Sequence, residues 1–128
     1  MMTAQTVLIV DDSAAIRELF TIAFTQAGFN VVSAENGQQA IQILRTQHID
    51  VMTLDHDMPL LSGLGVLRTL KETPCLDHTK VIFVTANDGL AFDELVVEFA
   101  DLVLLKPVSF SQLIQLASRL LMQHKATA

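Results

Sequence analysis

Five polar residues follow predicted hydrophobic strands and could together bind a metal ion and a phosphoryl group. They are Asp11, Asp12, Asp55, Thr85 and Lys106. Carboxylate oxygens are preferred ligands of hard divalent cations, and Mg²⁺ in turn binds phosphate oxygens. The ammonium group of Lys106 and the hydroxyl group of Thr85 suit phosphoryl oxygens, and a carboxylate can act as the nucleophile. The set favours metal-assisted phosphoryl transfer to a carboxylate, which we assign to Asp55.

The charges of these side chains give a physical reason to expect a cation beside them. Three carboxylates about 5 Å apart repel one another by roughly 3 kcal/mol per pair at an effective dielectric constant near 20. Without a counter-ion their pKa values rise. Each residue alone has an ordinary explanation, as a helix-capping acid, a turn residue, a strand end or a solvated charge. A single shared cause explains the whole set better than separate coincidences.

Short hydrophobic runs and amphipathic segments alternate along the chain. The predicted strands are residues 6–10, 30–34, 51–54, 80–84 and 102–105. The predicted helices are residues 16–27, 40–47, 63–70, 90–99 and 109–121. This alternation predicts an α/β fold, a doubly wound five-stranded parallel sheet with five helices on both faces. All five candidate residues then lie at the carboxyl edge of the sheet, where such folds bind ligands.

Composition limits the classes of function that the chain could have. At 128 residues it fits a single domain, with a core over about residues 6–121. A net charge of −6 and scattered Lys and Arg residues argue against direct nucleic-acid binding. No apolar run is long enough to span a membrane, no signal peptide begins the chain, and the single Cys75 excludes an internal disulfide. A cytoplasmic location is the expectation.

These motifs resemble the receiver domain of two-component response regulators. The similarity covers residues 6–121, nearly the whole chain. The matching motifs are Asp11-Asp12, Asp55 in an Asp-x-x-Met-Pro-x-x-x-Gly frame, Thr85-Ala86 and Lys106-Pro107. The resemblance implies a flavodoxin-like sheet with strand order 2-1-3-4-5. That order brings the first and third strands together, and with them Asp11, Asp12 and Asp55.

The resemblance also implies a role for each residue. Asp55 would accept a phosphoryl group from a phosphohistidine on a sensor histidine kinase or a phosphotransfer protein. The side chains of Asp11, Asp12 and Asp55 and the backbone carbonyl of Asp57 would hold Mg²⁺, with Asp11 acting largely through a bound water. Thr85 and Lys106 would contact the phosphoryl oxygens. Phosphorylation would alter a surface of helix 4, strand 5 and helix 5 that binds a downstream protein or a second copy of the chain.

The chain departs from the family pattern near its fifth strand. Val103 stands where the family usually has an aromatic residue, so an inward swing of a ring is not available. Phe99-Ala100-Asp101 replaces the usual Gly-Ala-Asp, and 21 positions separate Thr85 from Lys106, about one fewer than usual. Asp57 and Asn87 stand two positions after Asp55 and Thr85, where family members tune the lifetime of the phosphoryl group.

Two other functions fit part of the pattern. Asp55-His56-Asp57 resembles the Asp-x-Asp motif of haloacid-dehalogenase-like phosphatases, but that motif lies on the first strand of that family and is usually accompanied by a cap domain. A receiver that only binds partners is the other alternative, against which the five intact side chains argue. His56 alternates with Asp55 along the strand, so its side chain is expected on the opposite face. The chain is either a stand-alone receiver or a piece of a longer protein.

Overall fold

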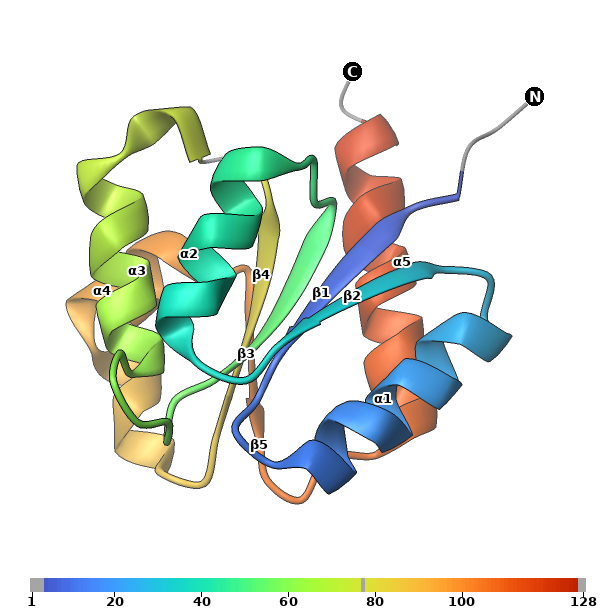
Figure 1. The fold of residues 1–128 in the computed structure, drawn as a ribbon, viewed down its shortest axis with the longest axis horizontal. Helices are drawn as coiled ribbons and strands as arrows, with labels where there is room; N and C mark the ends of the chain where they lie inside the picture. The colour runs from blue at the N-terminus through green and yellow to red at the C-terminus, as the bar shows by residue number, and fades with distance from the viewer. Residues whose placement is uncertain (1–3, 77, 127–128) are drawn as a thin grey trace.

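The computed structural model describes residues 4–76 and 78–126, which form a three-layer α/β fold (Figure 1). Its central sheet has five parallel strands in the order β2-β1-β3-β4-β5. The strands are β1 (Thr6–Val10), β2 (Asn30–Ala34), β3 (Val51–Asp55), β4 (Lys80–Thr85) and β5 (Leu102–Leu105). The predicted doubly wound sheet and its strand order are therefore confirmed.

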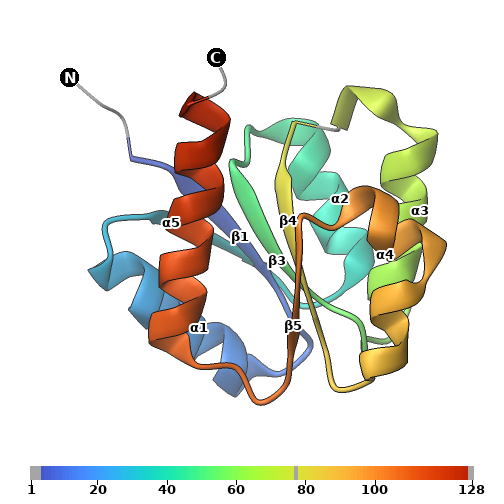
Figure 2. The ribbon, with the colours of Figure 1, turned by 180° about the vertical axis from the view of Figure 1, so that it is seen from behind.

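Helices cover both faces of the sheet. The α-helices are α1 (Ala14–Gln26), α2 (Gly37–Thr46), α3 (Gly63–Glu72), α4 (Glu94–Phe99) and α5 (Phe110–Ala126). Helices α1 and α5 pack on one face and α2, α3 and α4 on the other, as the two opposite views in Figures 1 and 2 show. Short 3₁₀ helices, η1 (Pro74–Leu76) and η2 (Asp88–Phe92), precede β4 and α4. Within the described residues, no helix has the length and apolar character needed to cross a membrane.

The core is divided by the sheet into two clusters. Alternate side chains of β1 enter different clusters: Leu8 and Val10 face α2 and α3, while Val7 and Ile9 face α1 and α5. All four side chains are buried, as expected for a strand covered on both faces. Burial of a side chain of this size contributes about 1.5–3 kcal/mol. The sheet is thus a rigid platform for the residues at its carboxyl edge.

The neighbouring strands β3 and β4 are each one residue longer than the sequence pattern predicts. β3 continues to Asp55, which pairs with Val84, and β4 continues to Thr85, which pairs with Leu105. Both polar residues are buried, with side chains at most 2% exposed. The pattern ended the strands at the last apolar residue, whereas backbone pairing carries them one position further.

The prediction of one helix over residues 90–99 is wrong. The segment folds as η2, which ends at Phe92, followed by the six-residue helix α4. Asp93 between them has extended dihedral angles, and its carboxylate accepts a hydrogen bond from the N–H of Leu95 at 2.9 Å. An aspartate that caps a helix in this way begins a new helix instead of continuing the previous one. Apolar periodicity alone could not reveal that break.

Candidate functional site

Three hydrogen bonds, to β2, to the loop after β1 and to α1, hold Asp11 in place. Its N–H donates to the carbonyl of Ala34 at 3.2 Å. Its Oδ1 accepts from the N–H of Ser13 at 2.9 Å, and its carbonyl accepts from Nη1 of Arg17 at 2.7 Å. Ser13 also caps α1, because its hydroxyl accepts from the N–H of Ile16. The side chain of Asp11 is 6% exposed, so this acid is both fixed and largely removed from water.

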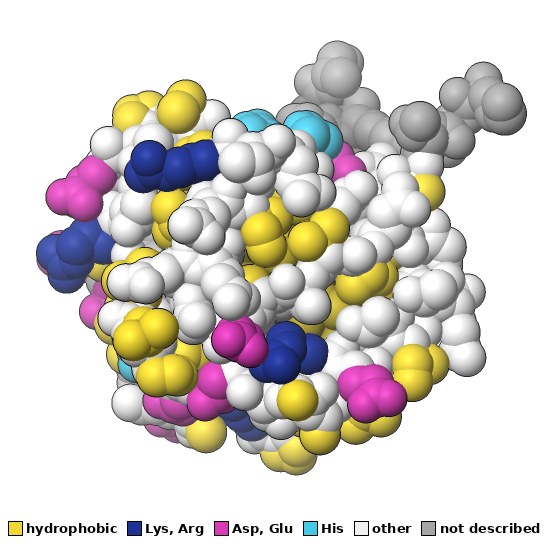
Figure 3. All heavy atoms as spheres, viewed as in Figure 1, with side chains coloured by type: hydrophobic (Ala, Val, Ile, Leu, Met, Phe, Trp, Pro, Cys, Tyr) yellow, Lys and Arg dark blue, Asp and Glu magenta, His cyan; other side chains and the backbone are white. Residues whose placement is uncertain are grey.

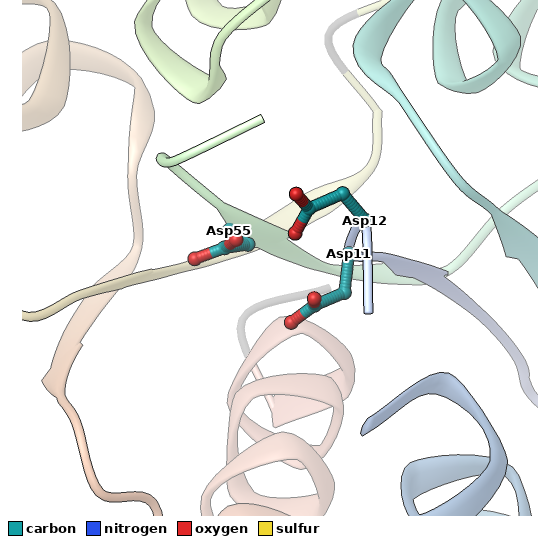
Figure 4. Close-up of side chains that lie close together, drawn as sticks. All are labelled: Asp11, Asp12 and Asp55. Carbon is teal, nitrogen blue, oxygen red and sulfur yellow. The ribbon is translucent and has the colours of Figure 1, made fainter. Parts of the chain in front are cut away.

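Three carboxylates meet where β1 and β3 end. Asp11, Asp12 and Asp55 each offer one oxygen, and these oxygens all lie within 4.8 Å of one another. Figure 4 shows the three side chains gathered at the ends of the two neighbouring strands. Asp11 and Asp55 are buried, whereas Asp12 is exposed. The sequence prediction that these acids form one cluster is borne out by this geometry.

A lysine from the end of β5 completes the cluster. Nζ of Lys106 lies 2.7 Å from Oδ1 of Asp55, a short ion pair between a half-exposed ammonium group and a buried carboxylate. The pair stands in an open cleft of about 590 Å³. Polar groups of the cleft come from the three acids, Ser13, Asp57 and Lys106, and its apolar wall comes from Ile16, Phe20, Val84, Pro107, Val108 and Phe110.

Burial and mutual repulsion change the pKa values of this cluster. Burial raises the pKa of Asp11 above its ordinary value of 3.8, and the charge of Asp12 adds to the effect. Burial also raises the pKa of Asp55, against the opposing hydrogen bond from Lys106. For Lys106, burial acts to lower the pKa, but the hydrogen bond and charge of Asp55 outweigh it and raise the pKa. The cluster thus has an excess of buried negative charge that one ammonium group does not remove.

Comparison with known proteins identifies this architecture. The response regulator receiver domain family matches residues 7–118. The chain belongs to that family. It is a receiver domain of two-component systems and, as such, a regulatory signalling domain.

Curated relatives of this receiver domain are longer proteins. The phosphate regulon transcriptional regulatory protein PhoB of Pseudomonas aeruginosa is 38% identical over 86 residues, which are 67% of this chain and 38% of PhoB. The autoinducer 1 sensor kinase/phosphatase LuxN of Vibrio campbellii is 29% identical over 108 residues, which are 84% of this chain and 12% of LuxN. The receiver domain therefore spans well under half the length of both relatives.

Solved structures share the whole fold. The response regulator TrrA of Thermotoga maritima, in complex with Mg²⁺-BeF, is 30% identical, with a TM-score of 0.81 over 91% of this chain and 98% of TrrA. A receiver domain protein of Methanospirillum hungatei has a TM-score of 0.87 over 98% of this chain and 100% of that chain, at 22% identity. The second likeness supports the CheY-like fold alone.

The receiver domain's acidic cluster has the chemistry of a divalent cation site. All three donors are carboxylate oxygens, two of them buried, and their excess negative charge is what a hard cation would neutralise. Within the described residues, no other group of three or more acids, histidines or cysteines lies close enough together to share an ion. The residues therefore fit a bound divalent cation, and Asp11, Asp12 and Asp55 are its candidate ligands.

Of the other residues predicted for the site, some line the cleft of the receiver domain and others lie outside it. Asp57 is exposed and lines the cleft, but the role of its backbone carbonyl stays a prediction. Thr85 is fully buried outside the cleft lining, and its hydroxyl accepts the N–H of Asn87 at 3.0 Å. Its contact with a phosphoryl group also stays a prediction. His56 packs against Phe83 with ring centroids 5.9 Å apart, on the face opposite the cleft, as expected from strand alternation.

Two features of the receiver domain were not predicted from the sequence. Arg17 donates to the carbonyl of Asp11, although nothing in its sequence position distinguishes it from an ordinary exposed helix residue. The apolar wall of the cleft contains Phe20 and Phe110, whose rings meet edge to face with centroids 5.5 Å apart. Both phenylalanines lie on helical apolar stripes, so the sequence indicated only a place in the core.

We expect Mg²⁺ to stabilise the fold in a pH-dependent way. At a concentration ten times its Kd, a ligand that binds only the folded state adds about 1.4 kcal/mol to the free energy of unfolding. For a chain of this size that raises Tm by about 3–6 °C. Mg²⁺ needs deprotonated carboxylates, so the gain grows as the pH rises through the raised pKa values of Asp11 and Asp55.

Without metal, the contribution of Asp11 and Asp55 to the free energy of unfolding should fall as the pH rises. Because these two pKa values are raised in the folded state, the stability that they contribute is present below the ordinary value of 3.8 and is lost as the pH rises through the raised values. Thermal unfolding in Mg²⁺ or a chelator, across this pH range, measures both effects for the wild type and Asp11→Asn. The variant should lose the Mg²⁺ gain; an equal gain in both proteins contradicts the site.

Proposed function

We propose that this receiver domain is a phosphoaspartate switch. Asp55 accepts a phosphoryl group from a phosphohistidine on a sensor histidine kinase or phosphotransfer protein, in a Mg²⁺-dependent reaction. The new group carries about two negative charges at neutral pH, enough to bias a protein between two conformations. The net charge of −6 supports protein partners over direct nucleic-acid contact. We expect the exchange to occur in the cytoplasm.

In the proposed reaction, a carboxylate oxygen of Asp55 attacks phosphorus in line with the phosphorus–nitrogen bond of phosphohistidine. A phosphorus–oxygen bond forms, the phosphorus–nitrogen bond breaks, and the imidazole leaves with its electron pair. Lys106 leaves Oδ1 of Asp55 and donates to a phosphoryl oxygen. Asp11, Asp12, Asp55 and the carbonyl of Asp57 would hold Mg²⁺, which would supply positive charge near the phosphoryl oxygens. Thr85 donates its hydroxyl proton to another phosphoryl oxygen, which is compatible with its oxygen accepting from the N–H of Asn87.

The observation that carries this proposal is the short contact between Lys106 and Asp55 inside the acidic cluster. An ammonium group 2.7 Å from a buried carboxylate, beside two further carboxylates, places a nucleophile, a phosphoryl-binding cation and the oxygens that would hold a metal ion in one cleft. Lysine holds a strongly hydrated point charge on a flexible stem, which suits a charge that must move from one oxygen to another. No other described residue group combines these features.

The proposal is tested by measuring intact mass after incubation with acetyl phosphate. The wild type should gain one phosphoryl group with Mg²⁺ and none with a chelator. Asp55→Asn should gain none under either condition, while Asp57→Asn, which removes the exposed neighbouring carboxylate, should still gain one. Circular dichroism confirms that each variant is folded. A phosphoryl group on folded Asp55→Asn would disprove the assignment of the acceptor.

The same Asp57→Asn variant tests how the phosphoryl group is lost. Asp57 lines the cleft, where its carboxylate can accept a proton from an attacking water, and the amide of asparagine cannot. We expect the phosphorylated variant to decay several-fold more slowly than the wild type, with little change in Tm because the side chain is exposed. The decay of the phosphorylated mass after donor removal gives both lifetimes, and equal lifetimes would refute a role for this carboxylate.

A multiple-turnover phosphatase is the alternative that the cleft must be tested against. The chain's Asp-x-Asp motif begins at the last residue of β3, and a second acidic pair follows β1, which supports a switch. A switch should release about one phosphate per protein unless donor is resupplied, and should leave p-nitrophenyl phosphate intact. Sustained release from that ester, lost in Asp55→Asn, would favour a phosphatase.

The proposed output surface is formed by α4, β5 and α5. Phe92 is 86% exposed, and Val97 and Leu105 are also exposed. A shallow groove of about 450 Å³ runs between η2 and β5, lined by Phe92, Val103 and Leu105 among others. We expect a downstream protein, or a second copy of the chain, to bind to this surface. Figure 3, viewed as Figure 1, faces α2 and α3 and shows apolar side chains among acidic ones at its lower left, over the loop between β3 and α3.

A further inference from the structure

Arg17, on α1, connects the loop that carries Asp11 and Asp12 to the loop after β2, at the carboxyl edge of the sheet. It belongs to the first half of α1, and its side chain is only 20% exposed. Nη1 donates to the carbonyl oxygen of Asp11 at 2.7 Å, and Nη2 lies 4.0 Å from Oε2 of Glu35, which follows β2. The guanidinium group therefore joins α1, the loop after β1 and the loop after β2.

The carbonyl that Arg17 holds lies just beyond the paired part of its strand. β1 pairs with β2 and β3 as far as Val10, and Asp11 continues only through its N–H, which donates to Ala34. A buried carbonyl beyond the ladder needs another donor, and Arg17 supplies a charged one. That bond fixes the plane of the peptide between Asp11 and Asp12. The direction of the Asp12 side chain, and hence its approach to Asp55, depends on that plane.

The position of the guanidinium group is unusual for an arginine near carboxylates. Arginine commonly binds a carboxylate through two parallel N–H···O bonds. Such a pair with Asp11 or Asp12 would occupy the oxygens that a cation needs. Here the arginine bonds a carbonyl on one side and faces the exposed carboxylate of Glu35 on the other. Arg17 therefore occupies none of the carboxylate oxygens of the cluster.

We propose that Arg17 is a positioning residue of the cation site: it fixes the Asp11–Asp12 peptide so that the carboxylates converge, without neutralising them. This inference rests on the proposed function, in which that cluster holds Mg²⁺. It assigns a role to a residue that touches neither the phosphoryl group nor the cation. The longer, exposed contact with Glu35 adds the loop after β2 to the same support.

The direction in which Arg17→Met changes the affinity for Mg²⁺ distinguishes a positioning role of Arg17 from a purely electrostatic one. If Arg17 acted only through its charge, Arg17→Met would bind Mg²⁺ more tightly, because a cation that repels Mg²⁺ would be gone. If it positions the acids, Arg17→Met binds Mg²⁺ more weakly. Loss of an outer support of a metal site costs about 10–100-fold in affinity. We expect a weakening of about tenfold, the lower end of that range, because lost repulsion offsets part of it.

The experiment is a calorimetric Mg²⁺ titration of the full chain at fixed pH and ionic strength. The variants are Arg17→Met, Arg17→Lys, Glu35→Gln and the control Arg45→Met, which removes the same charge at the far end of α2. We expect Arg17→Lys to fall between Arg17→Met and the wild type, because one charged donor remains. Glu35→Gln should weaken binding about twofold, as its contact is long and exposed. Arg45→Met should match the wild type.

The metal-free Tm of each variant is measured in parallel. A merely structural role of Arg17 would lower that Tm and leave the Kd for Mg²⁺ of the folded protein unchanged. An unchanged or tighter Kd in Arg17→Met therefore overturns the inference; should that variant not fold, an unchanged Kd in Arg17→Lys overturns it. The proposed function fails separately, if the wild type binds Mg²⁺ but gains no phosphoryl group from acetyl phosphate. A wild type that binds no Mg²⁺ overturns both.

Discussion

Lys106→Met should slow the phosphorylation of Asp55 by about 100-fold, the typical cost of removing one preorganised donor from a developing oxyanion. The same substitution should tighten Mg²⁺ binding several-fold, because Oδ1 of Asp55 loses the ammonium group that now lies 2.7 Å from it. The two effects have opposite signs for one reason: in the resting protein Lys106 occupies an oxygen that the cation and the phosphoryl group require.

Both effects can be measured on the same sample. The rate of mass gain from acetyl phosphate reports phosphorylation, and a calorimetric titration reports Mg²⁺ binding. Lys71→Met, which removes an exposed lysine at the end of α3, controls for net charge and should leave both quantities unchanged. Slower phosphorylation with weaker Mg²⁺ binding would mean that Lys106 supports the fold of the cleft instead of competing for Asp55.

Gly63→Ala should destabilise the protein by about 1–3 kcal/mol, the usual cost of overpacking a dense site. A Cβ at this position would lie 2.8 Å from the carbonyl oxygen of Asp55 and from Cα of His56, and 2.9 Å from the ring of Phe83. Two of these three atoms belong to the backbone of the β3 end, which cannot move without displacing Asp55. We therefore expect a Tm lower by about 3–15 °C and weaker Mg²⁺ binding together.

Gly65→Ala is the matched control for that substitution. It lies one half-turn further along α3, and its added Cβ would chiefly meet the side chain of Leu61, whose far end can rotate away. Alanine also favours a helix over glycine by about 1 kcal/mol. The control should be neutral or slightly stabilising. Equal decreases of Tm in both variants would show that α3 tolerates no added side-chain volume at either position. The close approach of Gly63 to the end of β3 would then not explain the loss of stability.

The fold could be predicted from the sequence to the extent that it follows from apolar patterning. The strands that read as continuous apolar runs, such as 6–10 and 102–105, appear with the predicted bounds. Strand order is different, because adjacency in a parallel sheet leaves no mark in the spacing of residues. The order 2-1-3-4-5 came from the resemblance to receiver domains and is confirmed.

The parts of the site that could not be predicted depend on backbone geometry. Leu60 has a φ of +70°, in the left-handed region that leucine rarely adopts, and nothing in its sequence neighbourhood demands it. The contact between Arg17 and the Asp11 carbonyl joins a side chain to a main-chain atom, which residue types alone do not specify. The acidic cluster itself was predictable because its acids follow β1 or end β3, and the resemblance to receiver domains places these two strand ends side by side at one edge of the sheet.

The most direct test of the central claim is to find the atom that carries the phosphoryl group. Borohydride reduces an aspartyl phosphate to homoserine, which marks the acceptor permanently. After incubation with acetyl phosphate and Mg²⁺, reduction and digestion, peptide sequencing by mass spectrometry should find homoserine at position 55. Homoserine at position 11, 12 or 57 instead, or no homoserine in a sample that gained a phosphoryl group, would contradict the account of this receiver domain as an Asp55 switch.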